Sequence, residues 1–437
     1  GIKAKTMSNI VMRNKVHTLI FIIFVCETRG NKVPSSSVPG TFKNKRLAKG
    51  DNDYQGYKNN FPAEDNAFGA PLPASGLRND SFAFVFADFG LCASPELTGE
   101  CCQTKVADAM RAKRAELEGL GKTLAFVGAG GDNFYWTGLN EAEACTSGVC
   151  GEDQWKRWSE VYDGLTDVPW LGAFGNHDWG NSDIYSTCPG LAPRVTVAGQ
   201  PYASNQLDAD KGGYRPEGSP QNFHVPDYNY RYTIDALNLE VFALDQNFND
   251  VGGIGGDASG HDQVELTCGG HQVLVDRLYD VGASGEALLQ DSAKLGSHNA
   301  SQVRNVLVLQ HYPNTCQGLS ETFLANVPSS GFGLGGQVDF RCAFGHVHES
   351  QCEAAAPGDG AGDSGDGGGD CAFAMVGSGG GCCDDPTKPL MTGDAGFGVV
   401  TFKPEGGLEL EQFTIGVACE LWPEGHVVTE LDRKMSY

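Results

Sequence analysis

Positive charge is scarce in this chain. It carries 31 Lys and Arg residues against 55 Asp and Glu residues, and its formal net charge is -24. The first 80 residues are basic by +6, so the remainder carries -30. A body this acidic repels nucleic acids and anionic membrane surfaces, which excludes both as bulk partners. A phosphate substrate would feel no long-range attraction, so an anion site in this chain needs a local positive centre.

The apolar run near the N-terminus is too short to span a bilayer. It has nine residues, 18–26, and lies between a basic stretch and a polar one. This pattern predicts a signal peptide over residues 1–30, with an uncleaved signal anchor as the alternative. Residues 31–80 are polar and are expected to be a low-complexity linker or pro-segment. We therefore expect a secreted, extracellular protein, or one in a lysosome- or vacuole-like compartment, with no membrane contact after cleavage.

Recurring Cys-x-x-Cys pairs are absent, which excludes zinc-finger modules. The 15 cysteines become 14 when Cys26 leaves with the signal peptide, and an even number in a secreted chain favours disulfides. Cys145 and Cys150 are spaced to close a small loop. The sequons at Asn79 and Asn299 predict a glycoprotein if the chain is secreted.

Apolar segments of strand length alternate with helix-forming segments through residues 81–437. This alternation predicts an α/β sheet core in one domain, with strands buried on both faces. A Gly- and Asp-rich stretch, residues 353–370, lacks the strict nine-residue period of calcium-binding repeats and is interpreted as an acidic insertion loop. The expected helices are 106–121, 153–165 and 271–290, and the expected strands are 82–87, 123–129, 168–174, 230–234, 239–245, 305–310, 338–344, 372–380, 397–402 and 408–416.

Five of the expected strands end in a residue able to bind a metal ion. Ligands of open α/β sheets bind outside the carboxyl ends of the strands, so these side chains are expected to meet. A helix cap or a turn would explain any one of them, but not the ordered set. In the turn after residues 123–129, Asn133 is expected to brace the backbone and to have no catalytic role. The candidate ligands are Asp88, Asp132, Tyr135, Asn176, His311, His346 and His348.

Seven ligands are too many for one tetrahedral zinc ion and suit two metal ions of higher coordination number. Two carboxylates and a tyrosine phenolate offer hard anionic oxygens, which favour a trivalent ion such as Fe³⁺. The neutral amide and the imidazoles suit a divalent ion. The sequence therefore predicts a dinuclear centre at the strand ends, and such a centre supplies the local positive charge that the acidic chain lacks.

The five blocks that carry these residues resemble a known family. In order, DFG, GDNFY, GNHD, QHYP and GHVH resemble the motifs of the calcineurin-like metallophosphoesterases, over roughly residues 82–416. The tyrosine of GDNFY resembles one branch, the purple acid phosphatases, and within it the small, single-domain, tartrate-resistant type. The resemblance implies a four-layer α/β/β/α sandwich with mixed sheets and a dinuclear metal site at the carboxyl ends of the strands.

The resemblance also implies a role for each residue. Asp88, Tyr135 and His348 would hold the ferric ion, and Asn176, His311 and His346 would hold a second ion, Fe²⁺, Zn²⁺ or Mn²⁺. Asp132 would bridge the two ions. His177 would contact the substrate phosphate and is the best candidate to protonate the leaving group.

The implied activity is that of an acid phosphatase, which hydrolyses phosphate monoesters by attack of a metal-bound hydroxide. The substrate would be a small phosphate ester or a phosphoprotein. A phosphodiesterase or nucleotide hydrolase using the same site is one alternative, and a secreted matrix or binding protein with weak activity is another.

Two positions depart from the family pattern. Ala87 stands where a glycine usually precedes the first aspartate, and Ser320 stands where the small branch usually has a histidine that helps to protonate the leaving group. His224 is the candidate substitute for that acid, although a lone loop histidine is more often structural.

Overall fold

Two mixed β-sheets carry the fold of this protein. In the computed structural model all the described residues belong to one unit, Asp51–Tyr437, and the other unit, Gly1–Gly50, lies outside them. The structure describes residues 77–78, 80–90, 102–134, 138–139, 151–179, 202–211, 213–215, 222–250, 271–295, 302–328, 337–347, 350–354, 371–376, 395–404 and 406–415.

The first sheet has the strand order β12-β11-β1-β2-β3-β4. Strands β1 to β4 run parallel, whereas β11 is antiparallel to β1 and β12 is antiparallel to β11. The four parallel strands therefore end at one edge of the sheet. The strands are β1 (Phe82–Phe86), β2 (Leu124–Gly130), β3 (Trp170–Ala173), β4 (Phe223–His224), β11 (Gly396–Phe402) and β12 (Leu408–Thr414).

The second sheet has the order β5-β6-β7-β8-β10-β9. Its four central strands are parallel, and β5 and β9 flank them in antiparallel orientation. This sheet is therefore mixed as well, but its antiparallel strands lie at both edges, whereas β11 and β12 lie on one side of the parallel strands of the first sheet. The strands are β5 (Tyr230–Ile234), β6 (Leu239–Ala243), β7 (Arg304–Leu309), β8 (Val338–Phe344), β9 (Ser350–Ala354) and β10 (Cys371–Val376).

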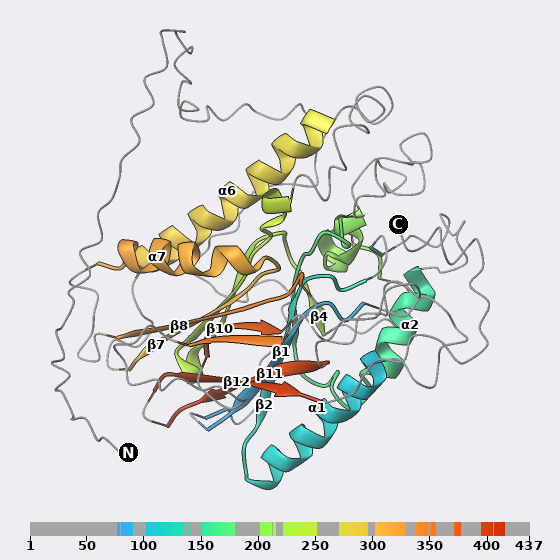
Figure 1. Ribbon diagram of the computed structural model, residues 1–437, viewed down its shortest axis with the longest axis vertical. Coiled ribbons are helices and arrows are strands. Elements are labelled where there is room, and N and C mark those ends of the chain that lie inside the picture. The colour runs from blue at the N-terminus through green and yellow to red at the C-terminus, as the bar shows by residue number, and fades with distance from the viewer. Residues whose placement is uncertain are drawn as a thin grey trace, which may run out of the picture. The chain divides into compact units, whose positions relative to one another are not determined.

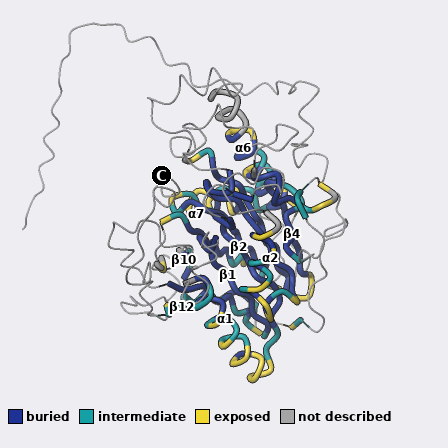
Figure 2. Tube along the Cα trace, turned by 90° about the vertical axis from the view of Figure 1, so that its right-hand side faces the viewer, coloured by how far each residue is buried: buried dark blue, intermediate teal, exposed yellow. Residues whose placement is uncertain are grey.

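The two sheets face each other and bury their central strands. Contacts between β1 and β8, β2 and β7, and β3 and β6 bring the parallel strands of one sheet against those of the other. All residues of β1 and β2 are buried, which explains why their sequences are continuous apolar runs. A Cβ on Gly128 would lie 2.9 Å from the Leu309 methyl groups, so β2 approaches β7 closely. Figure 2 shows this buried centre.

Helices lie on both sides of the strands (Figure 1). Helix α1 contacts β11 and α2, whereas α6 contacts β5 and α7 contacts β8. The aromatic face expected for residues 153–165 is confirmed, because Trp155, Trp158 and Tyr162 of α2 are buried. The helices are α1 (Cys102–Gly119), α2 (Gly151–Val161), α6 (His271–Leu295) and α7 (Cys316–Asn326), with 3₁₀ turns η5 (Tyr202–Gln206), η6 (Ala209–Lys211), η7 (Asp235–Leu237), η8 (Asn247–Asp250) and η9 (Pro313–Thr315).

The structure agrees with the mixed α/β class and with every expected strand and helix, within a few residues at their ends. Helix α7 and the strands β4 and β9 were not among the elements expected from the sequence alternation. Strand β9 takes the first two residues of the expected insertion, 353–370, and the rest of that segment lies outside the described residues. Disulfides are confirmed in two places, Cys316–Cys342 and Cys352–Cys371. Among the described residues, no helix is long and apolar enough to cross a membrane.

Several sequence expectations concern segments that the structure does not describe. The signal peptide over 1–30 and almost all of the segment 31–80 fall in this group. The Cys145–Cys150 loop and the two sequon asparagines, Asn79 and Asn299, lie outside the described residues as well. These expectations stay predictions.

Candidate metal centre

Five strand ends converge to form the candidate site. Strands β1, β2 and β3 of the first sheet and β7 and β8 of the second are followed, within one to three residues, by polar side chains. Because the strands of each group are parallel, their carboxyl ends share one edge. The facing pairs β1 with β8 and β2 with β7 bring the two edges together. The residues are Asp88, Asp132, Asn176, His311 and His346.

Three of these residues have a backbone conformation that residues other than glycine rarely adopt. The φ angle is 53° at Asp88, 53° at Asp132 and 76° at His346. Left-handed residues of this kind turn the chain sharply away from the strand, and they concentrate at functional sites. The turn after β2 adds Gly131, with a φ of 98°. The strand ends therefore aim their side chains toward one point.

Glycines next to the candidate ligands give the carboxylates room. A Cβ on Gly175, just before Asn176, would overlap the Asp132 side chain, and one on Gly345, just before His346, would overlap the Asp88 side chain. Glycine is required at both positions because a carboxylate of the neighbouring strand end occupies that space. The close approach of a carboxylate thus explains why the GNHD and GHVH motifs begin with glycine.

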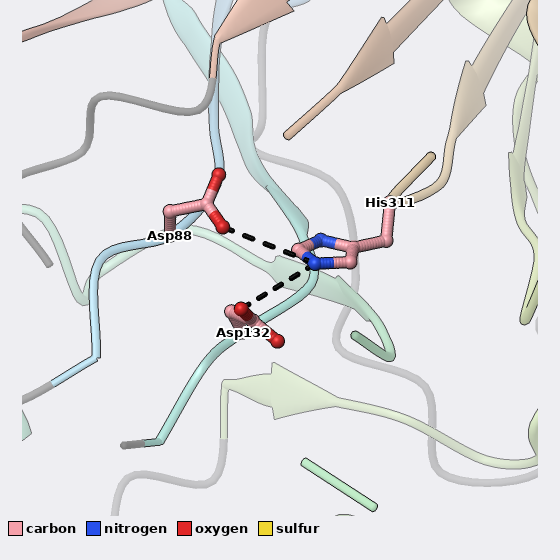
Figure 3. Close-up of side chains that lie close together, drawn as sticks. All are labelled: Asp88, Asp132 and His311. Carbon is pink, nitrogen blue, oxygen red and sulfur yellow. Dashed lines mark ion pairs between the residues drawn. The ribbon is translucent and has the colours of Figure 1, made fainter. Parts of the chain in front are cut away.

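Asp88, Asp132 and His311 form a buried group that could hold a metal ion (Figure 3). One potential ligand atom from each residue lies within 4.8 Å of the others. The His311 Nε2 atom is 3.9 Å from Asp88 Oδ1 and 3.4 Å from Asp132 Oδ2. All three side chains are almost fully buried. This is the only such group of His, Cys, Asp and Glu side chains in the part of the chain that the structure describes.

Asn176 and His346 extend this group. The Asn176 Oδ1 atom lies 3.1 Å from His311 Nε2 and 3.2 Å from His346 Nδ1. The backbone N–H of His346 donates to Asp88 Oδ2 at 2.9 Å. Five of the seven candidate ligands are therefore brought together. The other two, Tyr135 and His348, lie outside the described residues.

His177 lies at the edge of the group, beside Asp132. Its backbone N–H donates to Asp132 Oδ1 at 2.9 Å, and its imidazole Nε2 is 3.9 Å from Asp132 Oδ2. The residue keeps 8% of its surface exposed. Its ring therefore stands next to the carboxylate expected to bridge two ions, and its contact with a substrate stays a prediction.

Charges within the group shift its protonation strongly. Burial alone would raise the pKa of Asp132, but the neighbouring His311 and His177 hold it well below its usual range. Burial alone would lower the pKa of His311, but the carboxylates of Asp132, Asp88 and Asp178 raise it to about 9. The raised pKa favours the charged imidazolium of His311 at neutral pH in the metal-free protein, and the proton on Nε2 would have to leave for a metal ion to bind there.

Asp178 joins the turns after β2 and β3, a role that sequence reasoning missed. The fully buried carboxylate accepts the backbone N–H groups of Asn133 at 3.0 Å, Phe134 at 3.2 Å and Gly175 at 2.8 Å. The Gln206 amide donates to it at 2.7 Å. Burial, followed by the charge of Asp132, raises the pKa of Asp178 to about 7. Asp178 is the last residue of the GNHD motif, and an acid at this position was the sequence signal that could have indicated its role.

Asn133 braces the turn, as expected. Its Nδ2 atom donates to the Ala173 carbonyl at 2.7 Å and lies 3.3 Å from Asp178 Oδ2. His224, the candidate substitute acid, is instead a buried structural residue in this arrangement. Its Nδ1 atom is 2.7 Å from an Asp208 carboxylate oxygen, and its carbonyl accepts the Tyr230 hydroxyl. Ser320 lies on α7, partly buried.

The donor set fits metal ions. Carboxylate and amide oxygens combined with imidazole nitrogens are ligands for divalent and trivalent first-row ions. Asp88, Asp132 and His346 are held by sharp turns, and His311 Nδ1 lies 3.2 Å from the Gly130 carbonyl oxygen, so most of the site is shaped before an ion binds. Such preorganisation at a buried cluster of acids and histidines is the arrangement expected of a metal centre.

The comparisons with known proteins leave the family open. No protein-family model and no curated protein matches the sequence. Among solved structures, the chain is similar to a candidate 5'-nucleotidase from Staphylococcus aureus, determined in complex with alpha-ketoglutarate, with 11% sequence identity and a TM-score of 0.33. The match covers 82% of this chain but only 57% of that protein. A likeness this distant assigns no function to the chain.

Proposed function

We propose that this protein is a secreted acid phosphatase that hydrolyses phosphate monoesters at a dinuclear metal centre. One observation carries the proposal: five strand ends from two facing sheets place two carboxylates, an amide and two imidazoles together, with all but the partly buried His346 in the buried interior. The motif order, with His177 beside Asp132, favours phosphate chemistry over a purely structural metal site. The two sheets and their flanking helices are proposed to form the four-layer α/β/β/α sandwich of the metallophosphoesterases.

Each side chain has a proposed task in binding. Asp88, Tyr135 and His348 would hold the ferric ion, and Asn176, His311 and His346 the divalent ion. Asp132 would lie between both ions, which its negative charge and its place beside His311 favour. When bound, the ions supply Lewis-acid activation of water and neutralise the oxygens of the phosphate. They also give an acidic protein the positive centre that an anionic substrate needs.

We assign the protonation of the leaving group to His177. Its imidazole is close enough to Asp132 to lie beside a phosphate bound at the centre, where it would face the leaving alkoxide. In its protonated state it would donate a proton to that oxygen as the ester bond breaks. Burial of the neighbouring carboxylates excludes bulk water from the ligand atoms and strengthens their electrostatic interactions.

The iron assignment depends on Tyr135. If its phenolate binds Fe³⁺, the purified protein should be purple because of charge transfer from phenolate to iron. A visible spectrum recorded together with metal analysis tests this. Tyr135→Phe should abolish the colour while iron content is followed separately. A fully active, colourless and iron-free preparation would contradict the ferric assignment without removing the hydrolase proposal.

His177 is expected to matter most for poor leaving groups. His177→Gln should lower kcat about 100-fold for an alkyl phosphate such as glycerol 2-phosphate. The loss should be below about tenfold for p-nitrophenyl phosphate, because p-nitrophenolate leaves without much protonation. Steady-state kinetics with both substrates measure the difference. His224→Gln is the matched control, because His224 is a buried histidine outside the centre; equal losses for both substrates would argue against the proton-donor role.

The function itself is tested by hydrolysis with the metal-loaded chain. The expected result is turnover of p-nitrophenyl phosphate at acid pH, with much slower turnover of bis(p-nitrophenyl) phosphate. Preference for the diester would favour the phosphodiesterase alternative. Hydrolysis confined to nucleotides would favour a nucleotide hydrolase. Absence of hydrolysis of all three by protein that retains both ions would favour a secreted binding protein.

A further inference from the structure

The candidate centre lies across the seam between the two sheets. Asp88, Asp132 and Asn176 come from the first sheet, and His311 and His346 come from the second. The distances among the ligand atoms therefore depend on how the two sheet edges are held together. Facing strands occur in the order β1 with β8, β2 with β7, and β3 with β6, so the centre has a β1 side and a β3 side.

Main-chain contact closes the β1 side. The backbone N–H of Ala87, at the end of β1, donates to the carbonyl of Val376, the last residue of β10, at 3.0 Å. This bond joins the first sheet to the second one residue before Asp88. A side-chain network takes the corresponding place on the β3 side.

Two hydrogen bonds on the β3 side join the turn after β3 to the turn after β6. The indole Nε1 of Trp179 donates to Asp245 Oδ2 at 2.7 Å. The amide Nδ2 of Asn247 donates to the carbonyl of Phe174 at 3.2 Å. Phe174 and Trp179 lie on either side of Asn176 along the chain, so both bonds hold the segment that carries this candidate ligand.

Tyr312 extends the network to the histidines. Its hydroxyl donates to Asn247 Oδ1 at 2.8 Å. Its ring contacts the rings of His311 and His346, with centroids 5.1 Å and 4.7 Å away. The Asn247 side chain thus links two parts of the centre. Its Nδ2 atom bonds to the segment that carries Asn176, and its Oδ1 atom bonds to Tyr312, which contacts both histidines.

The network is buried, and Asn229 links it to helix α6. Trp179, Asp245, Asn247 and Tyr312 each expose 3% or less of their surface. Asp245 Oδ1 accepts the Asn247 backbone N–H at 3.0 Å, and the Asp245 backbone N–H donates to Asn229 Oδ1 at 2.9 Å. Asn229 in turn donates to the Val281 carbonyl of α6 at 2.8 Å. Buried polar groups satisfied in this way are directional and leave little freedom to slide, unlike apolar packing.

We propose that Trp179, Asp245, Asn247 and Tyr312 form an inter-sheet brace, a set of positioning residues that holds the two halves of the metal centre at binding distance. The proposal rests on the proposed metal centre and adds a determinant of its affinity. None of the four side chains was among the candidate ligands. Their effect on the ions acts through Asn176, His311 and His346.

Tyr312→Phe and Asn247→Ala test the brace in the full chain. After metal is stripped with a chelator, Zn²⁺ affinity is measured by equilibrium dialysis and stability by thermal unfolding. Tyr312→Phe removes one hydroxyl and keeps the ring, so it should fold and bind Zn²⁺ about tenfold more weakly. Asn247→Ala removes all three hydrogen bonds of the amide, those with the Phe174 carbonyl, Asp245 Oδ1 and the Tyr312 hydroxyl, and should weaken Zn²⁺ binding by about 100-fold.

Tyr230→Phe is the matched control. Its buried hydroxyl also crosses between the sheets, to the carbonyls of Gly172 and His224, and neither of these bonds involves one of the five described candidate ligands. It should lower the unfolding temperature as much as Tyr312→Phe does and leave Zn²⁺ affinity within twofold. Unchanged affinity in Tyr312→Phe and Asn247→Ala, or an equal loss in Tyr230→Phe, would overturn the brace. Zn²⁺ binding by the wild type without ester hydrolysis would overturn the proposed function alone.

Discussion

Asp132→Asn is expected to abolish hydrolysis and metal binding together. The carboxylate is proposed to lie between two cations, and a neutral amide removes the negative charge that offsets both. The loss of transition-state stabilisation should be several kcal/mol, which corresponds to a decrease in kcat of about 1,000-fold or more. The backbone should be unaffected, because asparagine tolerates the positive φ of residue 132 and its carbonyl oxygen can still accept the His177 N–H.

Metal analysis, p-nitrophenyl phosphate kinetics and thermal unfolding of the metal-free protein check this prediction. Asp153→Asn, at an exposed position of α2, is the control and should match the wild type in all three. Retention of both ions by Asp132→Asn would contradict the bridging role. A metal-free variant that unfolds well below the metal-free wild type would instead show that Asp132 is needed for folding.

Removal of the two ions is expected to lower the unfolding temperature by about 16 °C and to make stability fall as pH rises. Ions present at about 1,000 times their Kd stabilise a protein by about 4 kcal/mol each, and a large domain shifts by about 2 °C per kcal/mol. In the metal-free protein burial lowers the pKa of His311, but the surrounding carboxylates outweigh this effect and raise the pKa to about 9. A histidine in the unfolded chain titrates near 6.5.

The direction of the pH effect follows from that difference. Protonated His311 stabilises the folded state fully below about pH 6.5, and this contribution of about 3 kcal/mol is lost as pH rises through about 9. The raised pKa of Asp178, about 7, acts in the same direction at lower pH. Metal-loaded protein should lose this dependence, because an ion replaces the proton on His311.

Thermal unfolding between pH 6 and 9.5, with and without chelator, measures both effects. His311→Gln should remove the decline between about pH 7.5 and 9 in the metal-free protein, whereas the control His224→Gln should retain it. A metal-free wild type that becomes more stable from pH 6.5 to 9 would refute the proposed charge arrangement. An unfolding temperature unaffected by chelation would refute the metal centre itself.

Much of the strand pattern was predictable from local sequence. Phe82–Phe86 and Leu124–Gly130 are buried on both faces, so they are apolar runs that end abruptly in Asp88 and Asp132. That contrast between an apolar strand and a polar residue after it is a local signal, and it also predicted Asn176, His311 and His346. The convergence of these five side chains in one place agrees with the expectation drawn from parallel strands.

The strand pattern alone did not predict the division into two sheets, which only the family resemblance implied. Strand pairing depends on contacts between residues far apart in sequence, so a sequence could indicate parallel strands without assigning them to a sheet. The inter-sheet brace was missed for this reason: Trp179, Asp245 and Tyr312 acquire a shared role only where the sheets meet. Helix α7 is a different case. Cys316, Leu319 and Phe323 are buried at helical spacing, so the periodic signal was present and not used.

The left-handed backbone at Asp88, Asp132 and His346 has a consequence for mutational scanning. A saturation library would penalise most substitutions at these three positions twice, once for the lost ligand and once for backbone strain of about 1–2 kcal/mol, highest for β-branched residues. Asparagine and glycine largely escape the second penalty. In such a data set, the asparagine and glycine columns would measure the chemistry of the site, while the valine and isoleucine columns would measure the foldability of the chain.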